Sequence, residues 1–395
     1  MVRSRMGFSN LKRPKLSQGY TGLIIIAILS GIYLPSNSGQ ISMKRGVALS
    51  LGALSEWALI TNNYIHPDTW FRDVVFVNAT HGWIVGENGT LSRGGIILHT
   101  IDGGQTWNLQ FYEKIQTFRR ISIVNTSTIW VAGLGSLYYS YNGGQTWNQS
   151  VIADEPSGLG VSFLNETHGW TGTGHTLYRT IDAGQTWQED LAWTFEDTPR
   201  KVIFSTPMIG YIGGFFGVYK TNDGGVTWYQ QYQDDIFLGS IYIISETEGW
   251  LVGDNTLAHM TDGETWKRMP IPYDPETFHR VPYFHDVQFV TSDQGWIAGV
   301  YPPLMHTQDG GRSWYAQTMP GKVSGLSSLF FLNTTHGWAV GHDGLIILTV
   351  SGGGTGTKLV TPSSLIEPVY FLLGLTLLGL VAIIIVVISY KRFDR

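Results

Sequence analysis

The chain has 395 residues, including 49 Gly and 15 Trp, and it contains no Cys. Only 14% of the residues are charged and 43% are hydrophobic, which excludes a disordered tail and a coiled coil. Without Cys there is no disulfide framework, thiol nucleophile or Cys-ligated metal site. Abundant Gly beside 13% aromatic residues indicates many tight turns between short, aromatic-rich strands, which is typical of an all-β fold.

The N-terminal region combines a basic segment with an apolar one. Residues 1–19 carry five basic residues and no acid, and we expect them to form a cytoplasmic N-terminus. Residues 20–35 are mostly apolar, and about 15 such residues suit either a secretory signal or a short uncleaved anchor. Both alternatives stay open at this point.

The C-terminal region ends in a second apolar segment. Residues 369–390 carry no charge, and we expect this segment to form a transmembrane helix that follows a linker at 362–368. Lys391 and Arg392 begin a short tail, residues 391–395. Basic residues flank the outer side of both apolar segments, so the positive-inside rule places both ends in the cytoplasm and the region between them on the extracytoplasmic side of the cell membrane.

The net charge of −5 hides an uneven distribution along the chain. Residues 21–390 hold 12 more acidic than basic residues. A general nucleic-acid binder needs a basic surface, so the sequence excludes nucleic acid as the partner of this region.

A repeat of about 40 residues organises the chain between the two apolar segments. Its first mark is a short apolar strand that begins with Gly-Trp or a close variant. The seven copies start at Gly82-Trp83, Ile129-Trp130, Gly169-Trp170, Gly210-Tyr211, Gly249-Trp250, Gly295-Trp296 and Gly337-Trp338.

The second mark is a turn of the form Ser/Thr-x-Asp/Asn-x-Gly-x-Thr/Ser-Trp, which resembles the Asp box of bacterial neuraminidase-type repeats. Its acid can accept backbone N–H bonds within the turn, and its Trp can pack between neighbouring sheets, so we assign both structural roles. The acid or amide positions are Asp102, Asn142, Asp182, Asp223, Asp262 and Asp309. The Trp positions are Trp107, Trp147, Trp187, Trp228, Trp266 and Trp314.

Each repeat predicts four strands, which in the first copy cover residues 73–77, 82–86, 95–100 and 106–111. Four short strands per repeat and seven repeats predict a seven-bladed β-propeller over residues 50–361. The seventh box, residues 349–356, lacks both the acid and the Trp. Because Trp57 begins a segment similar to a box-Trp strand, we expect an N-terminal strand to complete the last blade and close the ring.

Arginines recur just before successive inner strands, on loops that surround one mouth of the central channel. Together with two Trp that fall outside the repeat pattern, these residues form the predicted partner-binding set: Arg72, Arg119, Arg120, Arg200, Lys201, Arg280, Trp70 and Trp193. Guanidinium groups pair with carboxylates through two hydrogen bonds, so this set favours an acidic partner segment. The same loops also carry acidic residues, so a solvated rim of mixed charge is the alternative that stays open.

The whole array of Gly-Trp strands and Asp boxes resembles the photosystem II stability/assembly factor family. That resemblance covers roughly residues 55–361 and implies a non-enzymatic propeller that docks on membrane-protein intermediates through an arginine-rich face. The C-terminal membrane helix departs from the usual pattern of that family.

Two other classes of function remain open from the sequence. A cell-surface receptor or envelope scaffold can also combine Asp boxes with one membrane helix. A glycoside hydrolase would need two facing carboxylates, for which Asp73, Asp197 and Asp286 are candidates. No motif for a metal, a phosphate or another cofactor is recognisable.

Six Asn-x-Ser/Thr sequences exceed the number that chance predicts for this composition, which fits an exported glycoprotein. Three of them occupy one equivalent repeat position, where Asn can also serve a turn. The glycosylation candidates are Asn78, Asn88, Asn125, Asn148, Asn165 and Asn333.

Overall fold

The computed structural model describes residues 56–61, 66–89, 94–134, 136–150, 152, 158–234, 237–273, 280–354 and 356–360. Contacts divide the chain into residues 1–46, none of them described, and residues 47–395, which contain all of the described ranges. The predicted apolar segments at 20–35 and 369–390, with their flanking tails and linker, lie outside the described residues. Within the described ranges, no helix has the length and apolarity required to cross a membrane.

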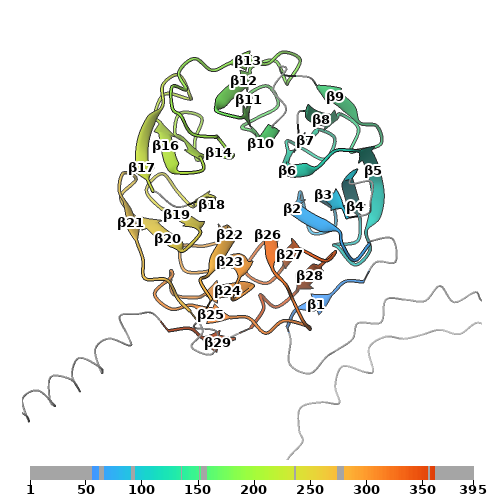
Figure 1. Ribbon diagram of the computed structural model, residues 1–395, viewed down its shortest axis with the longest axis vertical. Helices are drawn as coiled ribbons and strands as arrows, with labels where there is room; N and C mark the ends of the chain where they lie inside the picture. The colour runs from blue at the N-terminus through green and yellow to red at the C-terminus, as the bar shows by residue number, and fades with distance from the viewer. Residues whose placement is uncertain are drawn as a thin grey trace, which may run out of the picture. The chain divides into compact units, whose positions relative to one another are not determined.

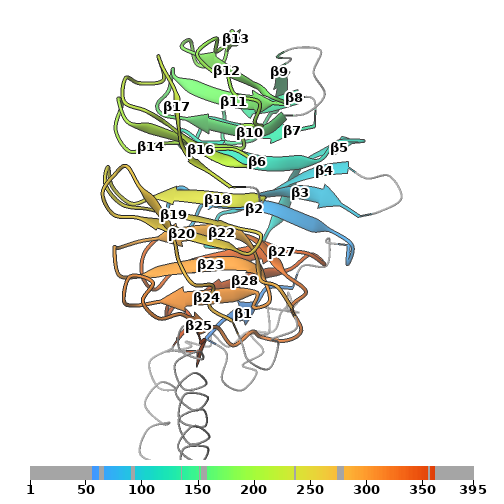
Figure 2. The same ribbon diagram turned by 60° about the vertical axis from the view of Figure 1, so that its left-hand side comes forward.

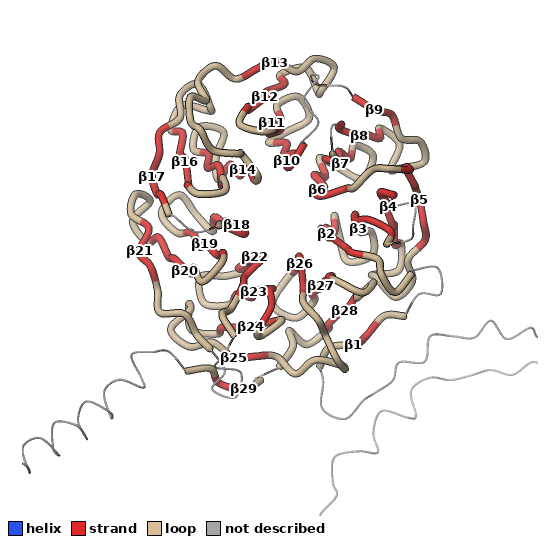
Figure 3. Tube along the Cα trace, in the orientation of Figure 1, coloured by secondary structure: helices blue, strands red, loops and turns tan. Residues whose placement is uncertain are grey.

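The described residues form seven antiparallel sheets arranged in a ring around a central axis (Figure 1). Every described element is a strand, a turn or a loop (Figure 3). The prediction of an all-β, seven-bladed propeller with four-stranded blades is therefore confirmed, with one addition in the sixth blade.

The strands of each blade follow one another in the chain from the inside of the ring outward. Blades one to three consist of β2 (Trp70–Phe76), β3 (Gly82–Asn88), β4 (Gly94–Thr100) and β5 (Asn108–Lys114); β6 (Phe118–Ile123), β7 (Ile129–Gly133), β8 (Ser136–Ser140) and β9 (Asn148–Ser150); and β10 (Gly158–Phe163), β11 (Gly169–Thr173), β12 (Thr176–Thr180) and β13 (Gln188–Glu189).

Blades four and five have the same order. They consist of β14 (Lys201–Phe204), β15 (Gly210–Gly213), β16 (Gly217–Thr221) and β17 (Tyr229–Gln233), and of β18 (Leu238–Ile243), β19 (Gly249–Gly253), β20 (Thr256–Met260) and β21 (Trp266–Arg268).

Blades six and seven contain the two departures from simple chain order. Blade six consists of β22 (Tyr283–Phe289), β23 (Gly295–Val300), β24 (Leu304–Thr307), β25 (Tyr315–Ala316) and β29 (Thr357–Lys358), and blade seven of β26 (Leu326–Phe331), β27 (Gly337–Gly341), β28 (Ile346–Thr349) and β1 (Ala58–Leu59).

The Gly-Trp strand is the second strand of every blade and lies deepest in the fold. All five residues of β7, β19 and β27 are buried. Neighbouring blades pack face to face, as the side view of the ring shows (Figure 2), so both faces of this strand are covered and both carry apolar residues.

The Trp of this strand contacts the Asp-box glycine of the next blade. Trp338 Nε1 donates a hydrogen bond to the Gly103 carbonyl at 2.9 Å, and Trp296 Nε1 donates to the Gly352 carbonyl at 3.1 Å. Gly311 has a φ of +77°, and a Cβ atom there would lie 2.2 Å from the Trp250 ring. The box therefore requires Gly both for its backbone conformation and for the approach of the neighbouring Trp.

The box acids accept hydrogen bonds within their own turns. Asp102 accepts from the Thr106 backbone N–H at 2.9 Å and from the Thr106 hydroxyl at 2.6 Å. The same backbone bond occurs at Asn142, Asp182, Asp223 and Asp309. In the shortened fifth box, Asp262 accepts from the Glu264 and Thr265 N–H groups. Because Thr106 belongs to this turn, β5 begins at Asn108 rather than at the predicted residue 106.

Closure of the ring by an N-terminal strand is confirmed. Strand β1 pairs with β28 in antiparallel register, with Ala58 opposite Leu348 and Leu59 opposite Ile347. Trp57 is only 2% exposed, and its ring meets the Phe331 ring edge-on at 5.9 Å.

A fifth strand in blade six was not predicted from the sequence. Strand β29 pairs with β25 outside the ring, with Tyr315 opposite Lys358 and Ala316 opposite Thr357. Strand β25 has only two residues and presents an unpaired edge, so the segment after the seventh box can hydrogen bond to it. Both ends of the described chain thus lie on the outer strands of adjacent blades.

Candidate functional site

Six of the seven inner strands contain a β-bulge near their first residue. A bulge leaves one residue outside the ladder and turns its side chain to a new direction. The bulged residues in five blades are Arg72, Arg119, Gly239, His285 and Ser327, and all five line one cavity of about 400 Å³ at a mouth of the central channel. Arg200, at the same position before β14, also lines it. We name these six residues the mouth ring.

The next residue of each inner strand occupies one equivalent register position, one residue further along the strand than the mouth ring. These residues, which we name the channel ring, are Asp73, Arg120, Gly160, Lys201, Ser240, Asp286 and Ser328. The channel ring contains two acids and two bases, whereas the mouth ring contains three arginines and no acid. Arg120 also reaches the cavity, which therefore has four arginines in its lining and no Asp or Glu among the described residues that line it.

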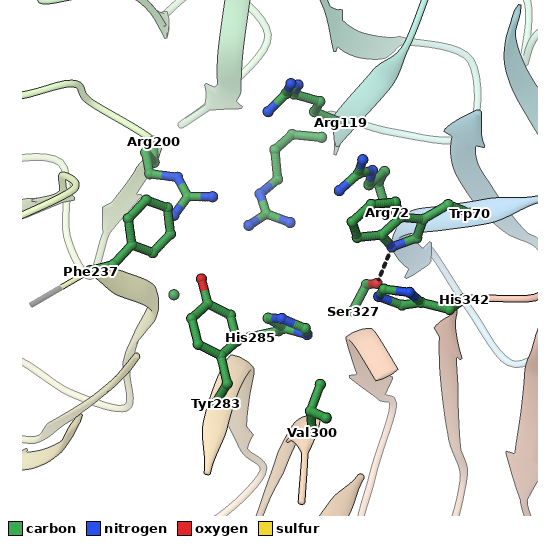
Figure 4. A pocket seen from close by; sticks show the side chains of 12 residues that line it. Trp70, Arg72, Arg119, Arg200, Phe237, Tyr283, His285, Val300, Ser327 and His342 are labelled. Atoms are coloured by element: carbon green, nitrogen blue, oxygen red, sulfur yellow. Dashed lines mark hydrogen bonds between the residues drawn. The ribbon is translucent and has the colours of Figure 1, made fainter. Parts of the chain in front are cut away.

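Aromatic residues at the start of three inner strands form the walls of the cavity. They are Trp70, Phe237 and Tyr283. Figure 4 shows Trp70 beside Arg72 and Phe237 beside Arg200.

Trp70 is held in place from three sides. Its Nε1 donates to the Ser327 hydroxyl at 2.8 Å, the Arg72 guanidinium lies 3.2 Å from its ring centroid, and the His342 ring lies at 4.2 Å (Figure 4). The pKa of His342 is lowered, mainly by burial and to a smaller extent by the positive charge of Arg72, so this imidazole is neutral at pH 7.

Arg200 is enclosed by two aromatic rings and a backbone carbonyl. Its guanidinium lies 4.8 Å from the Phe215 ring centroid and 4.7 Å from that of Phe237, and it donates to the Leu238 carbonyl at 2.8 Å. The pKa of Arg200 is lowered to about 9, mainly by burial and to a smaller extent by the positive charge of Arg120. At neutral pH the group therefore stays charged, although its solvation is poor.

Arg72 and Arg119 share a single carboxylate. Arg72 forms an ion pair with Glu87 on β3. Burial lowers the pKa of Arg72 even so, and burial together with Arg120 lowers the pKa of Arg119. Crowded, poorly solvated cations gain most from a bound anion, so the mouth ring is suited to carboxylate or phosphate oxygens.

A hydroxyl group bridges two acids in the channel ring. Ser328 Oγ lies 2.9 Å from Asp73 Oδ1 and 3.0 Å from Asp286 Oδ2. A hydroxyl has one hydrogen to donate, so both contacts are hydrogen bonds only when one acid is protonated.

The surroundings of the two acids favour Asp73 over Asp286 as the carrier of this proton. Burial, assisted by the charge of Asp286, raises the pKa of Asp73 despite Arg120. Burial opposes ionisation of Asp286 too, but Lys201 and Arg120 outweigh it and lower the pKa of Asp286. The Lys201 ammonium lies 3.5 Å from Asp286 Oδ1 and 3.0 Å from the Ser240 hydroxyl.

The structure brings five of the eight predicted partner-binding residues together. Trp70, Arg72, Arg119, Arg120 and Arg200 line the cavity. Lys201 instead lies in the channel ring and contacts Asp286.

Arg280 and Trp193 are not among the described residues that line the cavity. Arg280 precedes β22 by three residues and contacts Tyr301, with its guanidinium 4.4 Å from that ring. The mouth-ring position of blade six is His285, because the inner strand begins later than the Arg280 segment suggests. Trp193 is 8% exposed, packs on Tyr219 at 4.7 Å and donates to the His175 carbonyl.

Sequence reasoning missed the remaining lining residues: Phe237, Gly239, Tyr283, His285, Val300, Ser327 and His342. A signal for some of them exists in the aligned repeats. In five blades the bulged residue follows a buried Phe or Leu and precedes the channel-ring residue, as in Phe71-Arg72-Asp73 and Phe284-His285-Asp286.

The acids considered for glycoside hydrolysis are engaged in the fold. Asp197 is 4% exposed and accepts from the Phe215 N–H at 2.7 Å and the Tyr219 hydroxyl at 3.0 Å. Asp73 and Asp286 are the acids bridged by Ser328. Across the described ranges, no three His, Asp or Glu side chains come together so that they could hold a metal ion.

Comparison with known protein families matches residues 52–159 and 273–365 to the family described as Photosynthesis system II assembly factor YCF48. The Photosystem II assembly lipoprotein Ycf48 of Synechocystis sp. is 29% identical over 87 residues, which are 22% of this chain and 24% of that protein. The alignment thus spans about a quarter of the length of this curated relative.

Solved structures share the fold. A structure described as YCF48 bound to D1 peptide has a TM-score of 0.61 and 21% identity and covers 76% of this chain and 98% of its own. YCF48 from Cyanidioschyzon merolae has a TM-score of 0.58 and 20% identity, with 74% and 98% covered. The GH74 xyloglucanase of Xanthomonas campestris has a TM-score of 0.56 and 13% identity, with 74% and 53% covered.

Proposed function

The chain belongs to the photosystem II assembly factor YCF48 family, and from this premise we propose that it is a non-catalytic platform for a membrane-protein client during assembly. The solved YCF48 structure that holds a D1 peptide makes a peptide segment of such a client the natural kind of ligand. For this chain, the client segment is defined by the chemistry of the cavity.

One observation carries the proposal: four arginines line a single cavity, and among the described residues only Arg72 of these four has a direct ion pair with an acid. A client segment with acidic side chains or a C-terminal carboxylate would supply the missing anions through two-pronged guanidinium contacts. The aromatic walls would hold the apolar parts of the same segment. A volume of about 400 Å³ is enough for a few side chains, but not for a folded domain.

The proposed location follows from the terminal segments of the sequence. The C-terminal apolar segment would anchor the propeller on the extracytoplasmic side of the cell membrane, and the N-terminal one would either direct its export or serve as a second anchor. This placement would bring the cavity near the exposed segments of membrane proteins.

The contacts of the acids argue against the glycoside hydrolase alternative. A hydrolase needs one carboxyl to protonate the leaving group and a second one to reach the sugar or a water molecule. Asp73 and Asp286 share one serine hydroxyl, and Asp286 is only 7% exposed. Their hydrogen bonds favour a structural role.

The proposal is tested by recovery of the client from native membranes. The tagged full chain, gently solubilised, should co-purify with a stoichiometric membrane protein. The double variant Arg119→Ala/Arg120→Ala should recover at least about tenfold less, because each lost charge-assisted pair is worth about 1.5–3 kcal/mol. Arg312→Ala, which removes an exposed arginine of the sixth Asp box, should recover as much as the parent chain. Equal recovery by the double variant would overturn the proposal.

The receptor or scaffold alternative differs in timing. An assembly factor should bind newly made client and leave the mature complex, so pulse-labelled client should be enriched over older client in the purified fraction. An unchanging ratio would favour a permanent scaffold.

A further inference from the structure

Each blade has a turn between its first and second strands that contacts the Asp box of the same blade. In blade one the Gly103 N–H donates to the Thr80 carbonyl at 3.0 Å, and in blade seven the Gly352 N–H donates to the Thr335 carbonyl at 2.8 Å. The equivalent bond occurs in the other five blades. These turns and boxes therefore share one face of the ring, which we name the Asp-box face.

The Asp-box face lies opposite the arginine-lined cavity. The mouth ring is at the start of the inner strands, and the turns follow their ends. An inner strand of about six residues separates the two faces by about 20 Å at about 3.3 Å per residue.

One position in this turn supplies a side-chain oxygen to the backbone. It holds Asn78, Asn125, Asn165 or Asn333 in four blades and Thr206, Ser245 or Thr291 in the other three. Asn78 Oδ1 accepts from the His81 N–H at 2.8 Å, and Ser245 Oγ accepts from the Glu248 N–H at 3.1 Å. A hydroxyl thus satisfies the turn as well as an amide does, so the turn alone does not require Asn.

The four asparagines all belong to Asn-x-Ser/Thr sequences, but their amide groups differ. Three of the side chains are exposed, and in each of them Oδ1 accepts the hydrogen bond of the turn, so the turn does not need Nδ2. These are Asn78, Asn165 and Asn333. Asn125 is less exposed, and its Nδ2 donates to Glu166 Oε1 at 3.1 Å. Asn-x-Ser/Thr on an exposed turn is the acceptor geometry for N-linked glycans.

We propose that Asn78, Asn165 and Asn333 carry N-linked glycans, which cover the Asp-box face and leave the arginine-lined face open to the client. In the modification, Nδ2 attacks the anomeric carbon of a polyprenyl-phosphate-linked oligosaccharide. The Nδ2–C1 bond forms, the C1–O bond to the phosphate breaks, and the lipid phosphate leaves with that electron pair while Nδ2 loses one proton. Asn88 is left out of this set because it ends β3, on the cavity side of its blade.

This inference rests on the proposed extracytoplasmic location, so its test includes a separate check of location. The full chain purified from its native host is analysed by intact mass and by glycopeptide mass spectrometry. Asn78→Asp, Asn165→Asp and Asn333→Asp each keep the Oδ1 acceptor of the turn and remove the acceptor amide. Each variant should be lighter than the parent chain by the mass of one glycan. Its melting temperature should equal that of the parent chain without glycans.

A gain-of-site variant gives a second, independent readout. Ser245→Asn places an Asn-Glu-Thr sequence in the equivalent turn of blade five, identical to that of residues 165–167, and should add one glycan. Thr291→Asn places Asn in the same turn of blade six but creates Asn-Ser-Asp, which is not an acceptor, and should add none. Location is checked by adding protease to intact cells, which should cleave the propeller if it is extracytoplasmic. If the propeller is cleaved but the peptides of all three native sites carry no glycan, the inference is overturned and the proposed location stands. Protection from that protease would instead refute the location.

Discussion

Ser351 Oγ donates a hydrogen bond of 2.6 Å to Glu56 Oε2, although the two residues are 295 positions apart in the chain. In an intact box, such as that of blade one, the acid comes first and accepts from the Thr106 hydroxyl four residues later. In blade seven the acid and the hydroxyl have exchanged places. Trp57 follows Glu56 as a box Trp follows its hydroxyl residue. The seventh Asp box is therefore divided between the two ends of the propeller, and its contacts close the ring.

Trp57→Ala should destabilise the whole propeller. Removing a buried Trp costs about 3–5 kcal/mol, and here it also removes the contact with Phe331 that joins the two ends of the ring. The measurement is the midpoint of urea unfolding. Leu59→Ala on the same strand is the control, since Leu59 is 44% exposed and should change the midpoint little. Equal midpoints for both variants would show that the ring does not depend on this closure.

Gly311→Ala should cost more than its backbone conformation explains. Both Gly311 and Gly310 have φ near the left-handed helical value, +77° and +68°, so the backbone cost of Ala should be about 1 kcal/mol at either position. At Gly311 the new Cβ would lie 2.2 Å from the Trp250 ring, whereas at Gly310 the nearest atom is the Ser292 carbonyl oxygen at 3.2 Å. We expect a further loss of about 1–3 kcal/mol for Gly311→Ala in chemical denaturation. Similar losses for the two variants would argue against contact between blades at this point.

Asp73→Asn should change the pH dependence of stability. The pKa of Asp73 is higher in the folded protein than in the unfolded chain. The free energy of unfolding therefore falls as pH rises from the unfolded-state pKa through the folded-state pKa. Asn has no charge to bury, so Asp73→Asn removes this decrease in the free energy of unfolding. At pH values above the folded-state pKa of Asp73, the variant should be more stable relative to the parent than it is at lower pH.

Asp286→Asn gives the opposite sign. The pKa of Asp286 is lower in the folded protein than in the unfolded chain. It contributes stability that is present above the unfolded-state pKa and is lost as pH falls through the folded-state pKa. This variant should be less stable than the parent at neutral pH. Urea midpoints between about pH 2 and pH 8 test both variants, and profiles that run parallel to the parent would contradict the assignment of the proton to Asp73.

Glu87→Gln should strengthen the binding of an acidic peptide. Glu87 is the acid paired with Arg72, and without its charge the guanidinium is available to a ligand carboxylate. We expect about three- to tenfold tighter binding of a Glu-rich decapeptide by calorimetry at low salt, which corresponds to about 0.7–1.4 kcal/mol. Glu189→Gln on the exposed outer strand β13 is the control. Weaker binding by Glu87→Gln would mean that Glu87 positions Arg72 for the ligand rather than competing for it.

Much of the fold could be predicted because each blade repeats the same local chemistry. The Gly-Trp strand is apolar on both faces wherever neighbouring sheets cover it, and the Asp box carries its own hydrogen bonds. Closure of the ring was also predictable, since the residues missing from the seventh box reappear around Trp57. These features depend on contacts between residues close in sequence, or on a repeat that the sequence displays directly.

The sequence by itself determined the seven blades, the Asp boxes and the recurrence of arginine before the inner strands. Only the tertiary structure decided which arginines meet. The bulges turn Arg72, Arg119, His285 and Ser327 into the mouth, whereas Arg280 stays outside because the inner strand of its blade begins three residues later. The pairing of β29 with β25 and the serine between Asp73 and Asp286 were equally invisible. Each depends on register and on contacts between distant blades, which a one-residue shift would redirect without any change in composition or periodicity.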